Sequence, residues 1–443
     1  MLIAFSLVTY FSVAGLFWKD GEPKIIFWGI TLFWLSISIK LFYAVYAGVS
    51  YESLSTSKNI VETTYSALFA FIAFSVGMYF TTKKIRNKVL IDFSHDFGYS
   101  SRRIFYLYAA SMVSVPILIG LKYFIGGTDQ IVYALLDMKL GFIFMLVYAV
   151  YKRKDNVPFV IGFLLVEITL SFFSIFSQFK DILFATIVAL LAPRLNLSFK
   201  NVAAYAALGI VTIYLLFTWQ LIKDDYRSFL NKDSKEQVIK VSQEEALEKL
   251  QELATEKNNK KNEDVIYSSI DRLSYIEFYS ESRLKVPLYV PYENGKLWAA
   301  NIAHVLFPRF FFPDKGTIDD SQMVNKYCFK KVQTARSGVS FSLGFIAESY
   351  IDFGPAFMYI VVLLVGCLIG FIYSLILKQS INSFWAFTMA LPLYEKISCN
   401  GTAGSKILGG VITYYISFLL FRKYLMKPLD NYLRHGSFSD RVK

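Results

Sequence analysis

The feature that most constrains this chain is a series of long apolar runs. Runs of roughly 18–25 apolar residues recur along it, and each is long enough to cross about 30 Å of hydrocarbon as a helix. Of the 443 residues, 55% are hydrophobic, which exceeds the roughly 45–50% typical of soluble proteins. A transmembrane barrel would instead show alternating segments of about ten residues. The sequence therefore predicts an all-α, polytopic helical membrane protein.

The apolar runs predict about 11 spans. The first run lacks the basic start and small-residue cleavage site of a signal peptide, so we expect a span there. The seventh run is short for a full crossing. The expected spans are residues 2–18, 25–47, 63–80, 104–124, 134–151, 157–177, 181–193, 201–222, 355–377, 381–397 and 407–425.

Basic residues predict the orientation. With eleven spans, three stretches rich in Lys and Arg fall on the same side: the loop after the third span, the loop after the fifth and the C-terminal tail. The positive-inside rule makes that side cytoplasmic. The N-terminus is then outside, the C-terminus is inside, and the long polar region faces outward. The basic residues concerned are Lys83, Lys84, Arg86, Lys88, Arg102, Arg103, Lys152, Arg153, Lys154, Arg422, Lys423, Lys427, Arg434, Arg441 and Lys443.

These patterns divide the chain into four parts. Residues 1–222 hold spans 1–8, and 223–340 form a large outer loop with a cationic, aromatic segment. Residues 341–426 hold a re-entry segment and spans 9–11, and 427–443 form a cytoplasmic tail. The outer loop also contains apolar residues near helical spacing, which predict an amphipathic helix followed by a Lys/Asn-rich linker. They are Val238, Val241, Ala246, Leu247, Leu250 and Leu253.

Several classes of function are disfavoured. The three cysteines are too scattered for a disulfide framework, and the three histidines show no metal-ligand spacing, so we expect no metal. No phosphate-binding loop of the ATPase type is present. The net charge of +12 is accounted for by cytoplasmic loops rather than by nucleic-acid binding. We therefore expect neither a cofactor nor a nucleic-acid partner.

Two stretches near the second half of the chain combine cations with rigid or apolar residues. "HVLFPRFFFPDKGTIDD" (304–320) holds His304, Arg309 and Lys315, and its prolines prevent a long regular helix. "TARSGVSFSLGFIAESYIDFG" (334–354) holds Arg336, Glu348 and Tyr350. The first stretch also fits an interfacial anchor with cations reaching to water. Glu348 also fits a structural partner of a lysine, because ionisable groups at membrane depth usually face a cavity or a partner.

Further cations lie at the ends of predicted spans. Lys180 opens the seventh span, Lys223 and Arg227 close the eighth, and Arg272 lies in the outer loop. Each also fits an ordinary helix-end cation. Together they suggest a diphosphate site, because guanidinium forks match phosphate oxygens and lysines add charge. A carboxylate such as Glu348 would accept the proton of an attacking sugar hydroxyl, while Arg336 and Arg309 stabilise the departing diphosphate.

"FPRFFFPDK", "RSGVSFS" leading into "ESYIDFG", and "KDDYR" before the large loop resemble the oligosaccharide repeat-unit (O-antigen, Wzy-type) polymerases. The resemblance implies transfer of a growing glycan from undecaprenyl diphosphate to the next lipid-linked unit, without metal or nucleotide. It associates Arg227, Arg309 and Arg336 with polymerisation, and Lys180 departs from an arginine in many relatives. Substrate contacts are then expected at Lys180, Lys223, Arg227, Arg272, His304, Lys315 and Tyr350.

The resemblance also implies a location and partners. We expect a multi-pass protein of the bacterial inner membrane with its active site facing outward. Its partners would be the lipid bilayer, the undecaprenyl-diphosphate-linked oligosaccharide and a chain-length-regulating membrane protein. Two alternatives stay open. One is an O-antigen ligase, to which His304 also fits, and the other is a transporter of lipid-linked sugars, which would concentrate charges and broken helices at the membrane midplane.

Overall fold

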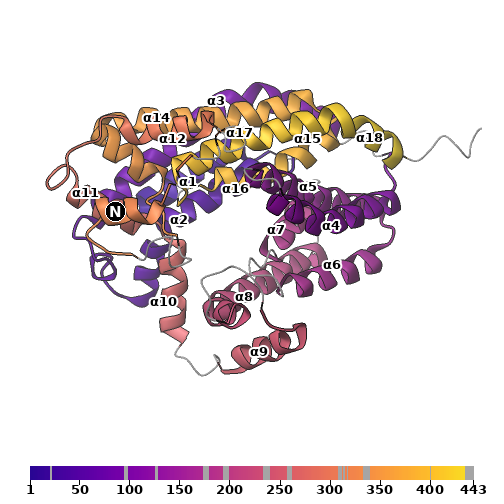
Figure 1. The fold of residues 1–443 in the computed structure, drawn as a ribbon, viewed down its shortest axis with the longest axis horizontal. Coiled ribbons are helices and arrows are strands. Elements are labelled where there is room, and N and C mark those ends of the chain that lie inside the picture. The colour runs from indigo at the N-terminus through magenta and orange to yellow at the C-terminus, as the bar shows by residue number, and fades with distance from the viewer. Residues whose placement is uncertain are drawn as a thin grey trace, which may run out of the picture.

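The structure, a computed structural model, describes all residues except 20–21, 94–97, 125–127, 173–178, 193–198, 233–239, 257–261, 308–311, 313–314, 317, 333–339, 400 and 435–443. The described residues form helices and no β-strand (Figure 1). The longer helices are α1 (Leu2–Phe17), α2 (Ile25–Ala47), α3 (Ile60–Phe93), α4 (Ser101–Phe124), α5 (Asp129–Arg153), α6 (Val157–Phe172), α7 (Phe179–Leu191), α8 (Phe199–Leu230), α14 (Phe345–Gln379) and α17 (Gly404–Phe421). The shorter ones are η1 (Glu52–Leu54), α9 (Gln243–Glu256), α10 (Asn262–Leu273), α11 (Ile276–Lys285), α12 (Lys296–Leu306), α13 (Asp320–Tyr327), α15 (Ser383–Ala390), η4 (Leu391–Leu393), α16 (Tyr394–Ile397), the π-helical turn η5 (Arg422–Met426) and α18 (Lys427–Leu433).

Six helices in the described part of the chain are long and apolar enough to cross a membrane. They are Ile25–Ala47, Ile60–Lys88, Ser101–Gly120, Gln130–Arg153, Phe345–Gln379 and Gly404–Leu433. This agrees with the predicted helical membrane protein. Over their described residues, the remaining predicted spans also fall on helices. These helices are short, have a short apolar part or form the broken series α15, η4 and α16. The count of eleven spans and the N-out orientation therefore stay predictions.

The centre of the fold is the packing of α14 against α3, which makes the most extensive contact between helices. Small residues allow this approach. A Cβ atom at Gly366 would lie 2.1 Å from the carbonyl oxygen of Phe74, and one at Gly77 would lie 2.3 Å from that of Leu363. Gly370 approaches α3 in the same way, at Thr81. Gly366 and Gly370 thus form a small-xxx-small pattern of the kind that brings membrane helices into backbone contact.

α14 contains a break near its start. Gly354 has a φ of 69° and a ψ of −174°, which are not helical, so the helix consists of two pieces that meet at this residue. A positive φ favours glycine because an L side chain clashes there, and Pro355 then begins the second piece. The first piece matches the position of the predicted re-entry segment, and the second matches that of the ninth span.

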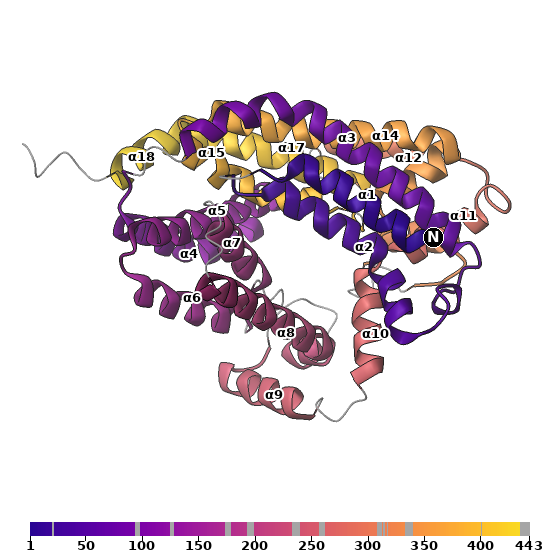
Figure 2. The same ribbon diagram turned by 180° about the vertical axis from the view of Figure 1, so that it is seen from behind.

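Buried polar contacts fix the α18 end and the second half of α3. α11 and α12 lie at one end and α18 lies at the other (Figures 1 and 2), so we call these the α12 end and the α18 end. At the α18 end, Asp430 accepts hydrogen bonds from Tyr99 and from Trp385 Nε1, the latter at 2.9 Å. Farther along α3, Arg86 donates from Nε and Nη2 to Glu22 and from Nη2 to the carbonyl of Phe17. These contacts tie the loops to the helices.

A smaller apolar cluster holds α9 to α7 and α8. Ala246 and Leu253 of the predicted amphipathic helix are buried against Tyr226 and Leu230 of α8. α8 runs to Leu230 and so passes the predicted boundary at residue 222. Val238 and the Lys/Asn-rich stretch at 257–261 lie outside the described residues. The segment predicted as the outer loop therefore begins with a helical extension of the eighth predicted span.

The α3–α14 contact leads to a test of the fold. Because a methyl group at Gly366 would overlap a backbone oxygen of α3, Gly366→Ala should lower stability by about 1–3 kcal/mol. Gly162→Ala is the matched control, since nothing lies within 4 Å of its Cβ position. Thermal unfolding of the purified proteins in detergent would measure both. Equal melting temperatures for Gly366→Ala and wild type would contradict the close approach.

Candidate active site at the start of α14

The first piece of α14 carries three polar side chains that dock α12. Glu348 Oε2 accepts hydrogen bonds of 2.9 Å from Asn301 Nδ2 and from the backbone N–H of Gly404. Ser349 Oγ accepts one of 3.1 Å from Trp298 Nε1. Glu348 is only 5% exposed. Its carboxylate therefore joins α12 and the start of α17 to α14.

Asp352 completes this docking. Its two carboxylate oxygens accept hydrogen bonds from the N–H groups of Leu297 and Trp298, at 3.1 and 2.8 Å. These N–H groups belong to the first turn of α12, and N–H groups in a first turn have no acceptor within their own helix. Asp352 thus caps α12 from another helix, and its negative charge lies at the positive end of the α12 dipole.

A cation lies beside these carboxylates. Lys406, in the first turn of α17, forms an ion pair of 2.5 Å with Asp320 of α13. Asp320 is buried, whereas the side chain of Lys406 is 56% exposed. Lys406 therefore holds α13 with part of its ammonium group and presents the rest to solvent.

Lys406 lines a polar pocket of about 240 Å³. The backbone of its Ser340–Ser342 wall is fixed by the N–H of Phe341, which donates to Ser321 Oγ at 2.9 Å. Gly401 leaves room for the ring of Tyr275, because a Cβ there would lie 2.4 Å from that ring. We call this the Lys406 pocket, and it is lined by Tyr275, Phe278, Ser340, Phe341, Ser342, Gly401, Thr402 and Lys406. Hydroxyl groups and one ammonium group suit an anion that also carries sugar hydroxyls.

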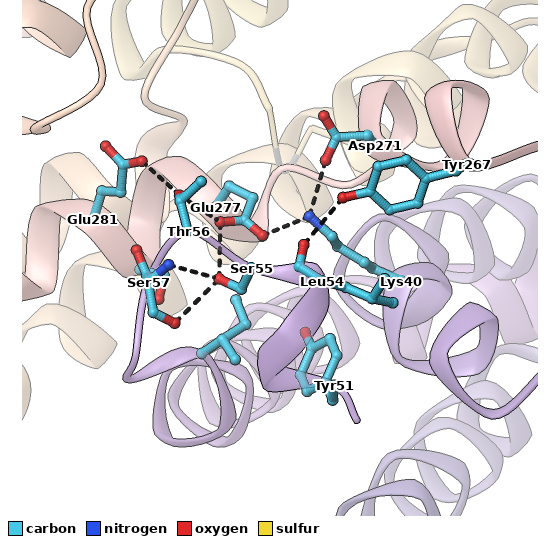
Figure 3. A network of polar contacts seen from close by, with 12 residues as sticks. Lys40, Tyr51, Leu54, Ser55, Thr56, Ser57, Tyr267, Asp271, Glu277 and Glu281 are labelled. Atoms are coloured by element: carbon cyan, nitrogen blue, oxygen red, sulfur yellow. Dashed lines mark hydrogen bonds and ion pairs between the residues drawn. The ribbon is translucent and has the colours of Figure 1, made fainter. Parts of the chain in front are cut away.

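A second network positions the helix that carries Phe278. Lys40 of α2 has a side chain that is 2% exposed, and its Nζ contacts Asp271 at 2.9 Å and Glu277 at 2.5 Å. Figure 3 shows that these carboxylates come from α10 and α11, while Ser55 and Thr56 reach the same region from the α2–α3 loop. A buried lysine between two carboxylates resists separation, because removing either partner leaves charge in an apolar environment. α10 and α11 are thereby fixed to the membrane helices.

The structure describes only some of the predicted site residues. Arg309 and Arg336 lie outside the described residues, and only the backbone of Arg272 is described, in α10. His304 lies in the last turn of α12, and Lys315 Nζ donates to the carbonyls of His304 and Phe307, the latter at 2.7 Å. Lys315 thus closes the C-terminal end of α12. α12 ends before Pro308, as the prolines predict.

The other predicted residues lie on separate elements. Lys180 is exposed at the start of α7, and Lys223 and Arg227 lie on α8, next to the cluster formed by Phe179, Trp219 and Tyr226. The structure therefore brings the start of α7 and the last turns of α8 together. Tyr350 instead belongs to the main core and donates to the carbonyl of Val286 at 3.0 Å. The roles predicted for all these residues stay predictions.

Sequence reasoning did not single out Lys406, Asp320 or Asn301. Lys406 precedes an apolar run, as many snorkelling lysines do, and nothing local marks it. Asp320 closes the "TIDD" stretch, which reads as a helix start. Asn301 lies three residues before His304 on α12, and its partner Glu348 is 47 residues away. Only the tertiary fold shows that these three residues surround Glu348 and the pocket.

Partly buried charged residues also lie where α5, α6, α7 and the short helix α16 meet. Lys139 of α5 pairs with Glu167 of α6, and Lys396 of α16 lies 3.8 Å from Asp137 of α5. Asp181 of α7 accepts a hydrogen bond of 2.8 Å from Tyr394. Ionisable residues at membrane depth usually mark a pathway or a binding site. These residues form a second polar region, between α5, α6, α7 and α16.

Metal and thiol chemistry find no support among the described residues. No group of three or more His, Cys, Asp or Glu side chains there could hold a metal ion. All three cysteines are free thiols. Burial raises the pKa of Cys328 to about 12, so this thiol stays protonated and is a poor nucleophile.

Most of the chain matches one known protein family. The match covers residues 26–390, and the family is described as Domain of unknown function (DUF8712). No curated protein and no solved structure gives a significant match. The family description assigns no activity, so the resemblance to repeat-unit polymerases stays a prediction.

The docking of α12 on Glu348 is testable by substitution. Glu348→Ala would leave Asn301 Nδ2 and the Gly404 N–H without their acceptor, at a cost of about 1–3 kcal/mol for each buried group. Both donors bind Oε2, so Glu348→Gln with its amide oxygen in that place keeps the acceptor for each of them, and the loss should be much smaller. Thermal unfolding measures both, with Glu62→Ala, an exposed site on α3, as control. Equal losses in the two Glu348 variants would contradict this role.

Proposed function

The chain belongs to the DUF8712 family, and we propose that it is a polymerase of lipid-linked oligosaccharide repeat units. It would transfer a glycan from an undecaprenyl-diphosphate donor to a hydroxyl group of a lipid-linked acceptor, during synthesis of an O-antigen, capsule or exopolysaccharide. Its site would face the outside of a bacterial inner membrane. The orientation proposed with it is eleven spans, with the N-terminus outside and the C-terminus inside.

The observation that carries the proposal is a cationic, hydroxyl-lined pocket at the ends of apolar helices. The Lys406 pocket lies where α17 begins, beside the first piece of α14. A lipid-linked diphosphate needs an apolar surface for its tail, cations for its phosphates and polar groups for its sugars. In the sequence, Arg336 precedes the pocket residue Ser340 by four positions. Arg336 and Arg309 would add guanidinium groups to the charge of Lys406.

The transfer can be written with these residues. The acceptor hydroxyl attacks the anomeric carbon, the bond from that carbon to the diphosphate breaks, and a glycosidic bond forms. The cations stabilise the departing diphosphate, whose negative charge grows in the transition state. Because Glu348 is buried and its Oε2 accepts two protein hydrogen bonds, we assign it a positioning role. The hydroxyl proton then passes to the departing diphosphate rather than to Glu348.

A transporter of lipid-linked sugars is the second candidate, and a specific observation favours it. The contacts between Lys139 and Glu167 and between Lys396 and Asp137 join the apolar helix α5 to α6 and to the short helix α16. α14 is also broken at Gly354, and the tenth predicted span is divided into α15, η4 and α16. Broken helices and charges near the midplane are features of transporters. The polymerase is preferred because the Lys406 pocket offers a cation and hydroxyls together.

Orientation gives the first test of the proposal. Reporters fused near residue 260 should report a periplasmic location, and reporters near residues 92 and 435 a cytoplasmic one, because basic residues concentrate in the latter two regions. Paired alkaline phosphatase and green fluorescent protein fusions measure this. A cytoplasmic reading at 260 would place the Lys406 pocket on the wrong side for the proposed reaction.

Glycan length gives the second test. Arg336→Lys and Arg309→Lys keep the charge but lose the bidentate fork, and loss of a transition-state donor costs about 10²–10³-fold in rate. Lys406→Met removes the ammonium group that would bind the diphosphate. Loss of a charged hydrogen bond typically lowers affinity or rate roughly tenfold or more. All three variants should give short glycans on a gel at matched expression. Lys249→Ala is the control and should keep the wild-type ladder, because this partly exposed lysine pairs locally, with Glu252 of the same helix α9.

Glu348→Gln distinguishes the two roles of that residue in the same experiment. If Glu348 is a positioning residue, the Glu348→Gln protein should retain most of the glycan ladder, since glutamine preserves the hydrogen-bond acceptor. Loss of the ladder in a well-folded Glu348→Gln protein would restore the general-base role. Wild-type ladders from Lys406→Met and both arginine variants would contradict the proposed cation site.

A further inference from the structure

A groove at the α18 end lies between the first turns of α4 and α6. Its volume is about 300 Å³. Ser101, Arg102 and Asn156 line it at the helix starts, and Phe105, Tyr106 and Phe159 line it one turn farther along. The α4 start is placed beside α18 by a hydrogen bond of 2.9 Å from Ser100 N–H to the carbonyl of Leu433. The groove therefore changes from polar to aromatic along the helix axes.

Arg102 is the cation of this groove, and most of its guanidinium group is available. Its Nε donates to Tyr106 Oη at 2.9 Å, and no other hydrogen bond of the group occurs within the described ranges. The two nearby arginines, Arg103 and Arg153, use a terminal nitrogen for hydrogen bonds within the protein. Arg103 donates to the carbonyls of Tyr432 and Arg434, and Arg153 to Asp155 and to the carbonyl of Tyr99. Arg102 alone of these three arginines leaves both terminal nitrogens for an incoming anion.

The backbone adds to this positive potential. α4 begins at Ser101 and α6 at Val157, and Asn156 Nδ2 donates to Ser101 Oγ at 3.2 Å, so the two helix starts are adjacent. The N-terminal end of each helix carries a partial positive charge and N–H groups that lack helical partners. An anion between them would meet two helix starts as well as the Arg102 fork.

The remainder of the groove faces the surroundings of the helices. Phe159 is 58% exposed and Tyr106 is 46% exposed. The ring of Phe105 lies 4.9 Å from that of Phe159 and bridges the two helices. Farther along α4, Val113 and Ile117 are exposed. Large apolar side chains exposed on a membrane helix are suited to acyl chains, and aromatic rings are common at the headgroup level.

We propose that this groove binds an anionic phospholipid. Its phosphate would contact Arg102 and the two helix starts, and its acyl chains would lie along the exposed faces of α4 and α6. The leaflet is the one at the α18 end, which the basic residues predict to be cytoplasmic. The occupant follows from the order of the groups, since a charged headgroup site continues directly into an apolar surface. This inference does not depend on the proposed polymerase activity.

The test is lipid binding to the purified full-length protein in zwitterionic detergent. A fluorescent phosphatidylglycerol probe should bind wild type more tightly than the matching phosphatidylcholine probe. Arg102→Gln should weaken phosphatidylglycerol binding roughly tenfold or more. The phosphatidylglycerol affinity of Arg102→Lys should lie between those of wild type and Arg102→Gln, because lysine keeps the charge but lacks the guanidinium fork. Arg422→Gln is the control, since Arg422 is an exposed arginine near the same end.

Three results would overturn the proposal. One is equal phosphatidylglycerol affinity in wild type, Arg102→Gln and Arg102→Lys. Another is equal weakening by Arg422→Gln, which would indicate general surface charge. The third is competition by soluble glycerol phosphate at the lipid's own concentration, which would indicate a free-phosphate site that does not need acyl chains. Thermal unfolding of each variant confirms that the binding measurement compares folded proteins.

Discussion

Two carboxylates and one hydroxyl group on the first piece of α14 fix the geometry of the α12 end. Glu348, Ser349 and Asp352 accept hydrogen bonds from α12, and Glu348 also accepts one from the start of α17. These groups are buried, so each lost partner would leave a polar atom without water. The break at Gly354 allows this short helix to lie where it does, since the spanning piece begins only at Pro355. The position of Lys406 in its pocket follows from this docking.

Much of the fold was predictable from the apolar runs alone. Over its described residues, each of the eleven predicted segments coincides with a helix or with a broken series of helices, because about 18–25 consecutive apolar residues have few other structures available in a membrane. The predicted ends of these helices were less accurate. α3 extends to Phe93 and α8 to Leu230, since polar residues beyond the bilayer can continue a helix without any change in hydropathy.

The site was less predictable than the fold. Glu348 was identified because a carboxylate in an apolar run is unusual, but its partners Asn301 and Gly404 come from distant elements. Lys40 is a similar case, because a lysine inside an apolar run gave no sign of Asp271 and Glu277, more than 200 positions later. Contacts of this range depend on how α10–α13 fold over the membrane helices. No periodicity or short motif carries that information.

Two polar regions compete as the functional centre. The Lys406 pocket suits an anionic, hydroxyl-rich substrate, whereas the partly buried charged pairs between α5, α6 and α16 suit passage through the membrane. The chemistry of the two regions differs, so a polymerase and a transporter should leave different intermediates in a cell that lacks this protein. A ligase would leave a third kind of intermediate.

The most direct measurement is therefore the lipid-linked glycans of a deletion strain, analysed by mass spectrometry and by their accessibility to external enzymes. A polymerase predicts single repeat units on undecaprenyl diphosphate at the outer face, with polymer restored by the wild-type gene. Full-length polymer that stays on the lipid carrier would indicate a ligase. Single units confined to the inner face would indicate a transporter. Either of these two results would contradict the proposed polymerase activity.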